Sequence, residues 1–316
     1  MVPKISYLSE GDLDALNITA DEIISMLGGL IEGAKAGKVH AAPKSVLTPP
    51  DKRYIMSTLA AMDDPPFVAT KTLVLNERNS ESNLPSINGI VTLIDGHTGI
   101  PLSVLDCNWI TGIRTAGLSA LAARHMANPD SRSLGIVGTG LQARWHLKLF
   151  KQMFPLETIR IAGRGKSNID RLAALASELG IEPVICSTPE DAVSNADIVV
   201  TSVTHTGVKR PFLQADWLAP GAFLSSVDLG APWHRKSFSS LDRLIIDDLS
   251  QESALPEKLA DPNDVHGDLA QLVAGAVAGR DLPNDRTAFV FRGMALGDLA
   301  LAVLAFQKHK RSGVSA

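Results

Sequence analysis

A glycine-rich turn in the middle of the chain has the residue types and spacing of a phosphate-binding loop. An apolar run over residues 134–137 leads into G-x-G-x-x-A, made of Gly138, Thr139, Gly140, Leu141, Gln142 and Ala143. In such a turn the first glycine permits a tight bend and the second lets the backbone approach a pyrophosphate. The small sixth residue allows close helix packing, and the helix N-terminus favours the phosphates. The motif, which alone could be a structural turn, predicts a dinucleotide site.

The loop after the second predicted strand bears on which dinucleotide binds. An acid there would accept the ribose 2′-OH of NAD, whereas a base would accommodate the 2′-phosphate of NADP. This loop holds Arg164, Lys166 and Ser167 and no acid. NADP(H) is therefore favoured as the cofactor, NAD(H) remains possible, and a merely solvated loop is the alternative. Thr204, which follows the predicted strand 198–203, is a further candidate for cofactor contact.

Three bases lie in apolar or glycine-rich surroundings, where an ordinary surface role is less favourable. They are Lys44, Lys71 and Arg114. A substrate with a carboxylate needs such fixed cations, although each could instead form a salt bridge. Lys71 lies in an apolar strand, where a neighbouring cation would lower its pKa and let it exchange a proton. Asp228 follows the predicted strand 222–227, at the end where such sheets meet ligands.

Two patterns of hydrophobicity predict the helices and strands that position these side chains. In the first third, a capping box at Thr19 and Glu22 predicts a helix to about Gly37. It is followed by β-rich runs at 54–59, 67–75, 89–94 and 101–105, which predict a largely antiparallel sheet. From residue 134, strands and helices alternate, which predicts a doubly wound parallel sheet. The predicted strands are 134–137, 158–161, 183–185, 198–203, 222–227 and 244–246, and the helices are 142–154, 168–179 and one from Pro189.

The length of 316 residues allows two domains. An Ala- and Leu-rich helix over 111–126 is a plausible connector, and the final helix, 294–308, is expected to return to the first domain. We therefore predict an α/β protein with a Rossmann-type doubly wound sheet, over residues 116–290, plus a second α+β domain formed by 1–115 with 291–316.

Composition excludes several classes of protein. Hydrophobic residues make up 45% and charged residues 20%, and 34 acids against 30 bases give a net charge of −4. No basic excess favours a nucleic-acid partner, and no apolar stretch approaches the ~20 residues of a membrane span. No apolar leader is visible, which favours the cytoplasm. Cys107 and Cys186 are far apart and no histidine has a partner at metal-ligand spacing, so no metal is expected.

Taken together, these motifs resemble the ornithine cyclodeaminase and mu-crystallin family. The resemblance covers nearly the whole chain, through residues 68–71, 95–102, 110–116, 138–143 with 146–147, 266–269 with 279–280, and 293–295 with 298. It implies a homodimer whose first domain binds substrate and pairs sheets across the two-fold axis, while the Rossmann domain binds NAD(P). It also implies that Arg114 and Lys44 clamp a substrate carboxylate, and that Gly293 contacts the cofactor.

The family unites several activities, and this chain departs from the cyclodeaminase pattern. The catalytic Asp expected two residues before Pro232 is Gly230, and residues 54–57 offer no acid where cyclodeaminases carry Glu. Lys44 stands where Arg is frequent, and Arg292 replaces a Ser-containing run. The two missing acids, together with the NADP-type loop, favour an NADPH-dependent reductase or dehydrogenase of a small imino or amino acid, such as pyrroline-2-carboxylate, with hydride transfer at the α-carbon.

In that hypothesis Lys71 assists proton transfer and Asp228 contributes charge near the imine. The alternatives are an ornithine cyclodeaminase, which converts ornithine to proline and ammonia with catalytic NAD, and a mu-crystallin-like protein that binds NADPH and a small ligand.

Overall fold

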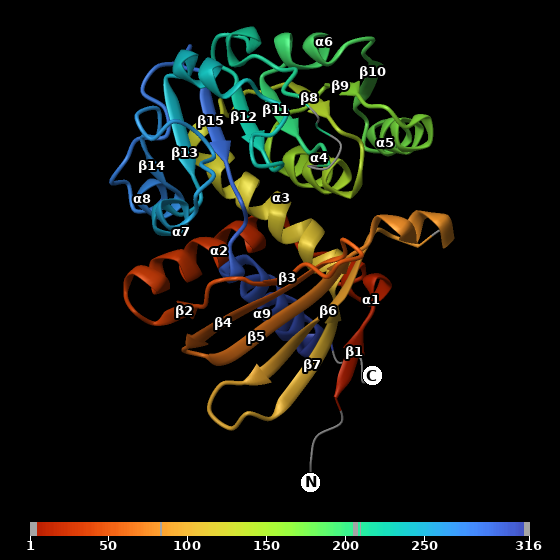
Figure 1. The fold of residues 1–316 in the computed structure, drawn as a ribbon, viewed down its shortest axis with the longest axis vertical. Helices are drawn as coiled ribbons and strands as arrows, with labels where there is room; N and C mark the ends of the chain where they lie inside the picture. Colours follow the sequence, from red (N-terminus) through yellow and green to blue (C-terminus); the bar gives the residue numbers. More distant parts are fainter. Residues whose placement is uncertain (1–4, 83, 205–207, 209, 313–316) are drawn as a thin grey trace. The chain divides into compact units, whose positions relative to one another are not determined.

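The computed structural model describes residues 5–82, 84–204, 208 and 210–312. The chain forms two compact units (Figure 1). The first contains the chain up to Arg114 together with the chain from Met294 onward, and the second is Thr115–Gly293. The divisions predicted from the sequence are 115/116 and 290/291.

A mixed sheet forms the framework of the first unit. Among the described residues it has seven strands in the order β1-β7-β6-β5-β4-β2, with β3 also pairing with β4. The strands are β1 (Ser6–Leu8), β2 (Val39–Ala41), β3 (Ser45–Leu47), β4 (Tyr54–Asp63), β5 (Pro66–Leu75), β6 (Ile87–Asp95) and β7 (Pro101–Asp106). The four strands from β4 to β7 are antiparallel, as predicted; β5 and β7 match their predicted bounds to within one residue, whereas β4 and β6 are longer than predicted. The short strands β1 to β3 were not predicted.

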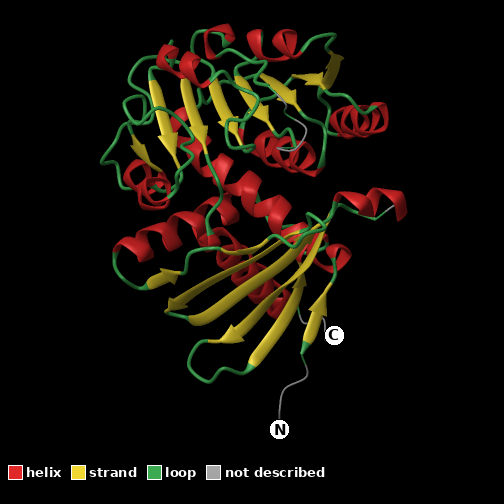
Figure 2. Cartoon of the chain, in the orientation of Figure 1, coloured by secondary structure: helices red, strands yellow, loops and turns green. Residues whose placement is uncertain are grey.

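Two long helices complete the first unit (Figure 2). α9 (Ala295–Arg311) packs on β4 and β5, and α2 (Ala20–Lys35) packs against α9. The capping box at Thr19 begins α2, as predicted. The shorter helices are α1 (Glu10–Asp14) and η1 (Glu77–Ser82), and α3 (Cys107–Met126) starts in this unit. Residues 69, 71 and 73 of β5 are inward-facing in this arrangement, which puts one lysine among the core positions.

The second unit is a doubly wound parallel sheet, so the predicted fold class is confirmed. Its eight strands among the described residues have the order β10-β9-β8-β11-β12-β15-β13-β14. They are β8 (Ser133–Val137), β9 (Thr158–Ala162), β10 (Glu182–Ile185), β11 (Ile198–Thr201), β12 (Phe223–Ser226), β13 (Arg243–Ile246), β14 (Gly267–Asp268) and β15 (Thr287–Val290). The strand order reverses at β8, which is the switch point where such sheets bind ligands.

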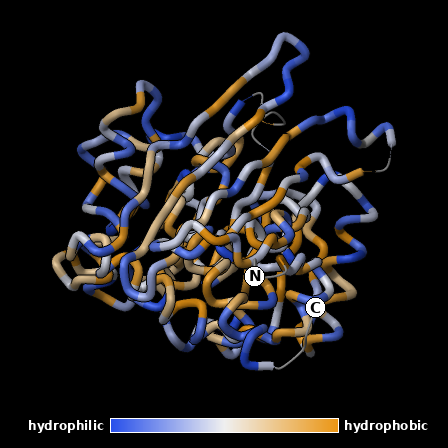
Figure 3. Tube along the Cα trace, turned by 90° about the horizontal axis from the view of Figure 1, so that it is seen from below, coloured by the Kyte–Doolittle hydropathy of each residue, from blue (hydrophilic) through white to orange (hydrophobic). Residues whose placement is uncertain are grey.

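Helices flank this sheet. They are α4 (Leu141–Met153), α5 (Lys166–Glu178), α6 (Pro189–Ser194), α7 (Leu249–Ala254) and α8 (Leu269–Val273), with 3-10 turns η3 (Ala215–Trp217) and η4 (Arg235–Ser240). The strands β11, β12 and β15 are buried along their whole length. Figure 3 shows how hydrophobic and hydrophilic stretches alternate along the whole chain. No helix in the described ranges has the length and apolar character to cross a bilayer.

Candidate functional site

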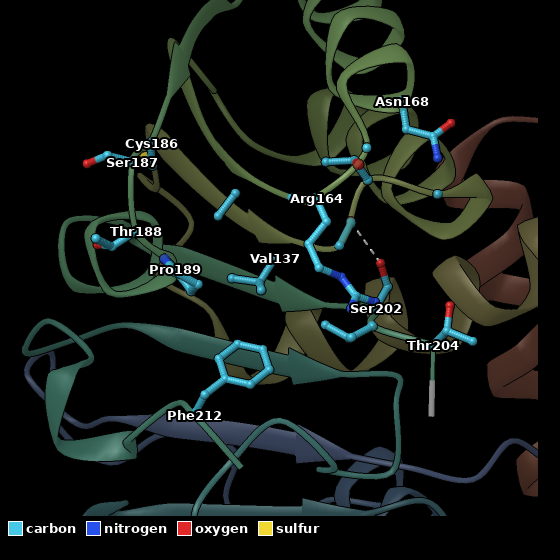
Figure 4. A pocket seen from close by; sticks show the side chains of 17 residues that line it. Val137, Arg164, Asn168, Cys186, Ser187, Thr188, Pro189, Ser202, Thr204 and Phe212 are labelled. Atoms are coloured by element: carbon cyan, nitrogen blue, oxygen red, sulfur yellow. Dashed lines mark hydrogen bonds between the residues drawn. The ribbon is translucent and has the colours of Figure 1, made fainter. Parts of the chain in front are cut away.

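A pocket of about 580 Å³ lies in the second unit at the carboxyl ends of β8 to β11 (Figure 4). It is lined by the glycine-rich turn, the loop after β9, the segment after β10 and the segment after β11. The lining residues are Val137, Gly138, Thr139, Gly140, Ala162, Gly163, Arg164, Gly165, Asn168, Cys186, Ser187, Thr188, Pro189, Ser202, Val203, Thr204 and Phe212. The pocket therefore occupies the switch point of the sheet, where a dinucleotide is expected.

The two glycines of the turn meet different demands. Gly138 has φ +97°, and a Cβ there would lie 2.6 Å from the carbonyl oxygen of Ser202. The Ser202 hydroxyl in turn donates to the Gly138 carbonyl at 3.1 Å, the dashed contact in Figure 4. A Cβ on Gly140 would meet no atom within 4 Å, and Gly140 caps α4 without a side-chain hydrogen bond. The first turn of α4 is thus open to an incoming phosphate, which fits a pyrophosphate.

Five predicted cofactor residues line this pocket: Gly138, Thr139, Gly140, Arg164 and Thr204. Figure 4 shows Arg164 extending into it from the loop after β9. Arg164 is exposed, and in the described part of the chain its side chain has no hydrogen bond or ion pair. Its guanidinium is therefore available to an anion.

The remaining predicted cofactor residues do not line the pocket. Leu141, Gln142 and Ala143 form the first turn of α4, where the fully buried Ala143 permits the close packing that the motif requires. Ser167 is exposed in the first turn of α5. Lys166 differs from the expectation most clearly, because its ammonium pairs with Asp170 one helical turn away, at 2.7 Å.

Gly293, another predicted cofactor residue, does not line the pocket either. Its N–H donates to the Asp247 carboxylate at 2.8 Å, at the end of β13. Neighbouring Arg292, to which the sequence assigns no role, donates to Glu252 at 2.9 Å and to the carbonyl of Glu257. Arg292 therefore holds the segment after α7 in place.

Sequence reasoning missed the polar groups after β10 and in α5. Asn168, Ser187 and Thr188 line the pocket. Since ligands meet parallel sheets at the carboxyl ends of strands, the residues directly after the predicted strand 183–185 carried a usable signal.

A second cluster of functional groups lies in the first unit, between the sheet and α9. Lys71 on β5 donates to Oδ1 of Asp298 at 2.7 Å, and Thr58 on β4 donates to Oδ2 at 3.0 Å. The Nε of Arg114, on α3, lies 3.1 Å from the same Oδ1. Thr58 and Lys71 are register partners across β4 and β5, which brings both to one carboxylate. The structure therefore brings together two predicted substrate residues, Lys71 and Arg114, around an acid from the end of the chain.

This trio is buried and carries a formal charge of +1. Lys71 is 1% and Asp298 3% exposed. Burial, and then the charge of Arg114, lower the pKa of Lys71, while Asp298 opposes them. Burial raises the pKa of Asp298, but Lys71 and Arg114 outweigh it and bring that pKa below its ordinary value. Arg114 Nε is buried and lacks a well-aligned hydrogen bond, despite its short distance to Asp298. A buried trio with one surplus positive charge and an unsatisfied donor favours an anionic ligand.

The surroundings of the trio are largely apolar. Met56 and Leu73, which face each other across β4 and β5, pack with Cys107 of α3. Burial raises the pKa of the Cys107 thiol and keeps it neutral. Met56 lies in the segment where the cyclodeaminase Glu was expected. Lys44, the third predicted base, is half-buried directly before β3, whose Ser45 pairs with Ser57, next to Thr58.

Asp228 lies in the second unit and is held by the protein itself. One of its oxygens accepts from Thr201 at 3.0 Å and from Ser226 at 2.6 Å, and the other accepts the N–H of Val203 at 3.0 Å. Burial nevertheless raises its pKa. These bonds tie the end of β12 to the segment after β11 that lines the pocket. That Asp228 places a charge beside the substrate stays a prediction.

The part of the chain that the structure describes holds no group of three or more His, Cys, Asp or Glu side chains placed to bind a metal ion.

The chain is similar in sequence to known proteins. The ketimine reductase mu-crystallin of Mus musculus is 31% identical over 258 residues, which are 80% of this chain and 79% of that protein. The Δ1-pyrroline-2-carboxylate reductase of Bacillus cereus is 27% identical over 259 residues, 77% of this chain and 78% of that protein.

Among solved structures, the Δ1-pyrroline-2-carboxylate reductase of Thermococcus litoralis, in complex with NADH and L-proline, superposes with a TM-score of 0.89 at 25% identity, over 99% of both chains. The model of the ornithine cyclodeaminase/mu-crystallin family matches residues 9–313. The chain therefore belongs to the ornithine cyclodeaminase/mu-crystallin family, as its motifs predicted.

Proposed function

We propose that this protein is an NADPH-dependent reductase or dehydrogenase of a small imino or amino acid, of the pyrroline-2-carboxylate type, with hydride transfer at the α-carbon. The observation that carries the proposal is the buried trio of Lys71, Arg114 and Asp298, whose charge of +1 one carboxylate would neutralise. A carboxylate bound to Arg114 would also satisfy its buried donor. Lys44 is the further clamp that the family resemblance implies.

A nicotinamide cofactor is supported by the pocket in the second unit and by relatives. The Thermococcus litoralis reductase binds NADH, and the mouse relative is a ketimine reductase. NADPH is the finer proposal, supported by the guanidinium of Arg164, which has no partner among the described residues, and by the lack of an acid in the loop from 163 to 167. When bound, the nicotinamide supplies or accepts the hydride.

The protein's own groups then hold the substrate and move a proton. Arg114 and Lys44 orient the carboxylate, and Lys71, desolvated beside Asp298, gives a proton to the substrate nitrogen in the reductive direction. We also propose Asp228 as a catalytic residue. Its carboxylate accepts the N–H of Val203, and it thereby holds the backbone of a segment that lines the pocket.

The residues beside the trio favour this function over cyclodeamination of ornithine. Met56, Leu73 and Cys107 are apolar or neutral, so they suit the hydrocarbon part of a cyclic imine better than a second ammonium. Cyclodeamination, which is the alternative enzyme activity, would need acids that residues 54–57 and Gly230 do not supply. Binding of NADPH and a small ligand without turnover is the second alternative.

Oxidation of NADPH and NADH, followed at 340 nm, tests the proposal. The substrates are pyrroline-2-carboxylate, piperideine-2-carboxylate, and pyruvate with ammonia, beside ammonia release from ornithine with catalytic NAD. We expect NADPH oxidation with an imino acid, and a loss of roughly 10²- to 10⁴-fold in kcat for Lys71→Ala. Lys38→Ala, at an exposed lysine of the same unit, should leave kcat unchanged.

Two other results would decide against the reductase. Ammonia from ornithine without net change in cofactor would establish the cyclodeaminase. Undiminished NADPH binding with no turnover of any substrate would establish the binding protein.

The proposed state is a homodimer, with no nucleic acid or membrane partner, and the proposed location is the cytoplasm. The outer face of the first unit's sheet supports the dimer, because large apolar side chains such as Leu59 and Ile90 are exposed on it.

A further inference from the structure

We propose that Asp298 is the positioning residue for proton transfer, which aims Lys71 and keeps it in its charged, proton-donating form. The inference rests on the proposed function and adds to it a residue from the C-terminal helix, α9.

The Asp298 carboxylate is fixed from three sides. Oδ2 accepts the Thr58 hydroxyl at 3.0 Å, and Oδ1 accepts the Lys71 ammonium at 2.7 Å, with Arg114 Nε at 3.1 Å. These contacts join β4, β5 and α3 to α9. Because Thr58 occupies the oxygen that Lys71 does not use, the carboxylate cannot turn without losing a buried hydrogen bond. Lys71 is thereby held in one direction on the inner face of the sheet.

Three groups bear on the charge of Lys71 from the elements packed against it. Arg114 on α3 disfavours the ammonium, Cys107 on α3 has a small opposite effect, and Asp298 on α9 favours it. Burial also disfavours the ammonium, and is the largest effect. Asp298 is the full negative charge that opposes both burial and Arg114. Without it, Lys71 would be a buried amine beside a guanidinium and would lose its proton at a lower pH.

The step needs that proton. In reduction, the hydride adds to the imine carbon and the π pair of the C=N bond moves to nitrogen, which forms an N–H bond with a proton from Lys71. Lys71 becomes a neutral amine, the nicotinamide is oxidised by two electrons, and water returns a proton to Lys71. A lysine whose ammonium is populated but weakened by burial suits this transfer.

Two measurements on the full-length protein test the inference. The first is the pH dependence of kcat for imine reduction in the wild type, Asp298→Asn and Thr58→Val. We expect the alkaline fall in kcat to move at least one pH unit lower in Asp298→Asn, which is a tenfold loss at alkaline pH that recovers as the pH is lowered. Thr58→Val should shift it in the same direction by less, while NADPH affinity is unchanged in both.

The second measurement is the titration of Lys71 by NMR of lysines labelled at Cε, with Lys71→Arg used to assign the signal. It reports the charge on Lys71 without turnover, and we expect the same downward shift in Asp298→Asn. If Asp298→Asn does not fold, Thr58→Val supplies both measurements.

The outcomes separate the inference from the proposed function. A uniform loss of kcat at all pH values, with a lower Tm and an unmoved Lys71 titration, would mean that Asp298 is only structural and would overturn the inference. A rise in KM for the imino acid at constant kcat would overturn it too, since Lys71 would then be only a carboxylate clamp. A shifted Lys71 titration in a protein that reduces no imine would instead overturn the proposed function.

Discussion

At the scale of single residues, Arg164 is the side chain on which the preference for NADPH depends in our proposal. It reaches into the pocket with no partner in the described part of the chain, whereas nearby Lys166 is already paired with Asp170. A hydrogen bond to a charged group contributes about 1.5–3 kcal/mol, so Arg164→Gln should weaken NADPH binding by roughly 10- to 100-fold and leave NADH binding unchanged. Binding titrations followed by nicotinamide fluorescence measure both affinities.

Lys166→Gln is the matched comparison for this prediction. We expect it to change NADPH affinity much less, because the Lys166 ammonium already has a carboxylate at 2.7 Å. Equal losses for NADPH and NADH in Arg164→Gln would contradict the assignment of Arg164 to the 2′-phosphate.

Single residues also show what the sequence could reveal about the site. Lys71 and Arg114 were identifiable because a charged side chain in an apolar segment is rarely buried unless it has a partner or a ligand. Asp298 was noted only as part of the family resemblance, and its pairing with Lys71 was not predictable, because the two lie 227 positions apart and only the packing of α9 on the sheet brings them together. The ion pair of Lys166 could also have been anticipated, because Asp170 lies four residues later on the same helix, so its role toward the cofactor stays a prediction.

At the scale of elements, local signals explain which ones were predictable. The capping box at Thr19 begins α2 where expected, and the glycine-rich turn lies between β8 and α4 as predicted. β15 (Thr287–Val290) was missed, although it lies between β12 and β13 in the sheet. A four-residue buried strand has no periodicity of its own, and its place is set by partners far away in the chain.

A buried histidine connects three elements of the second unit. Because of it, we expect the stability of the folded protein to fall at acidic pH. His146 on α4 contacts the Gln142 carbonyl through Nδ1 at 2.7 Å and Ser119 of α3 through Nε2 at 2.8 Å, and Ser225 of β12 donates to Ser119. The carbonyl requires a proton on Nδ1, so the neutral ring accepts at Nε2. Burial lowers the pKa of His146 from 6.5 to about 4.

Because the unfolded chain binds the proton more tightly, the stabilisation by neutral His146 is complete above pH 6.5 and is lost as the pH falls to about 4. The full shift corresponds to about 3 kcal/mol. Urea unfolding at pH 7 and pH 4.5 should show a smaller difference in the free energy of unfolding for His146→Gln than for the wild type. An equal difference in the two proteins would assign the acid sensitivity to carboxylates instead.

At the scale of the whole molecule, the two faces of the first unit's sheet differ in what covers them. The inner face carries Lys71 and is covered by α9, whereas the outer row runs from Leu59 through Thr70 and Thr92 to Val104. Leu59 is 44% and Ile90 46% exposed in the single chain. Exposed apolar side chains on one face of a sheet, here on β4 and β6 on either side of β5, mark an interaction surface, and a second copy of the same sheet presents a matching one.

We therefore expect the wild type to sediment as a dimer and Leu59→Glu to sediment as a monomer, because a carboxylate buried in an apolar interface has no partner there. Leu282→Glu is the matched control, since Leu282 is a 64% exposed leucine of the second unit. Analytical ultracentrifugation at micromolar concentration distinguishes the two states. A dimeric Leu59→Glu, or a monomeric wild type, would remove this face from the interface. A monomer that still reduces imines would show that Lys71, Arg114 and Asp298, which come from one chain, act without a partner subunit.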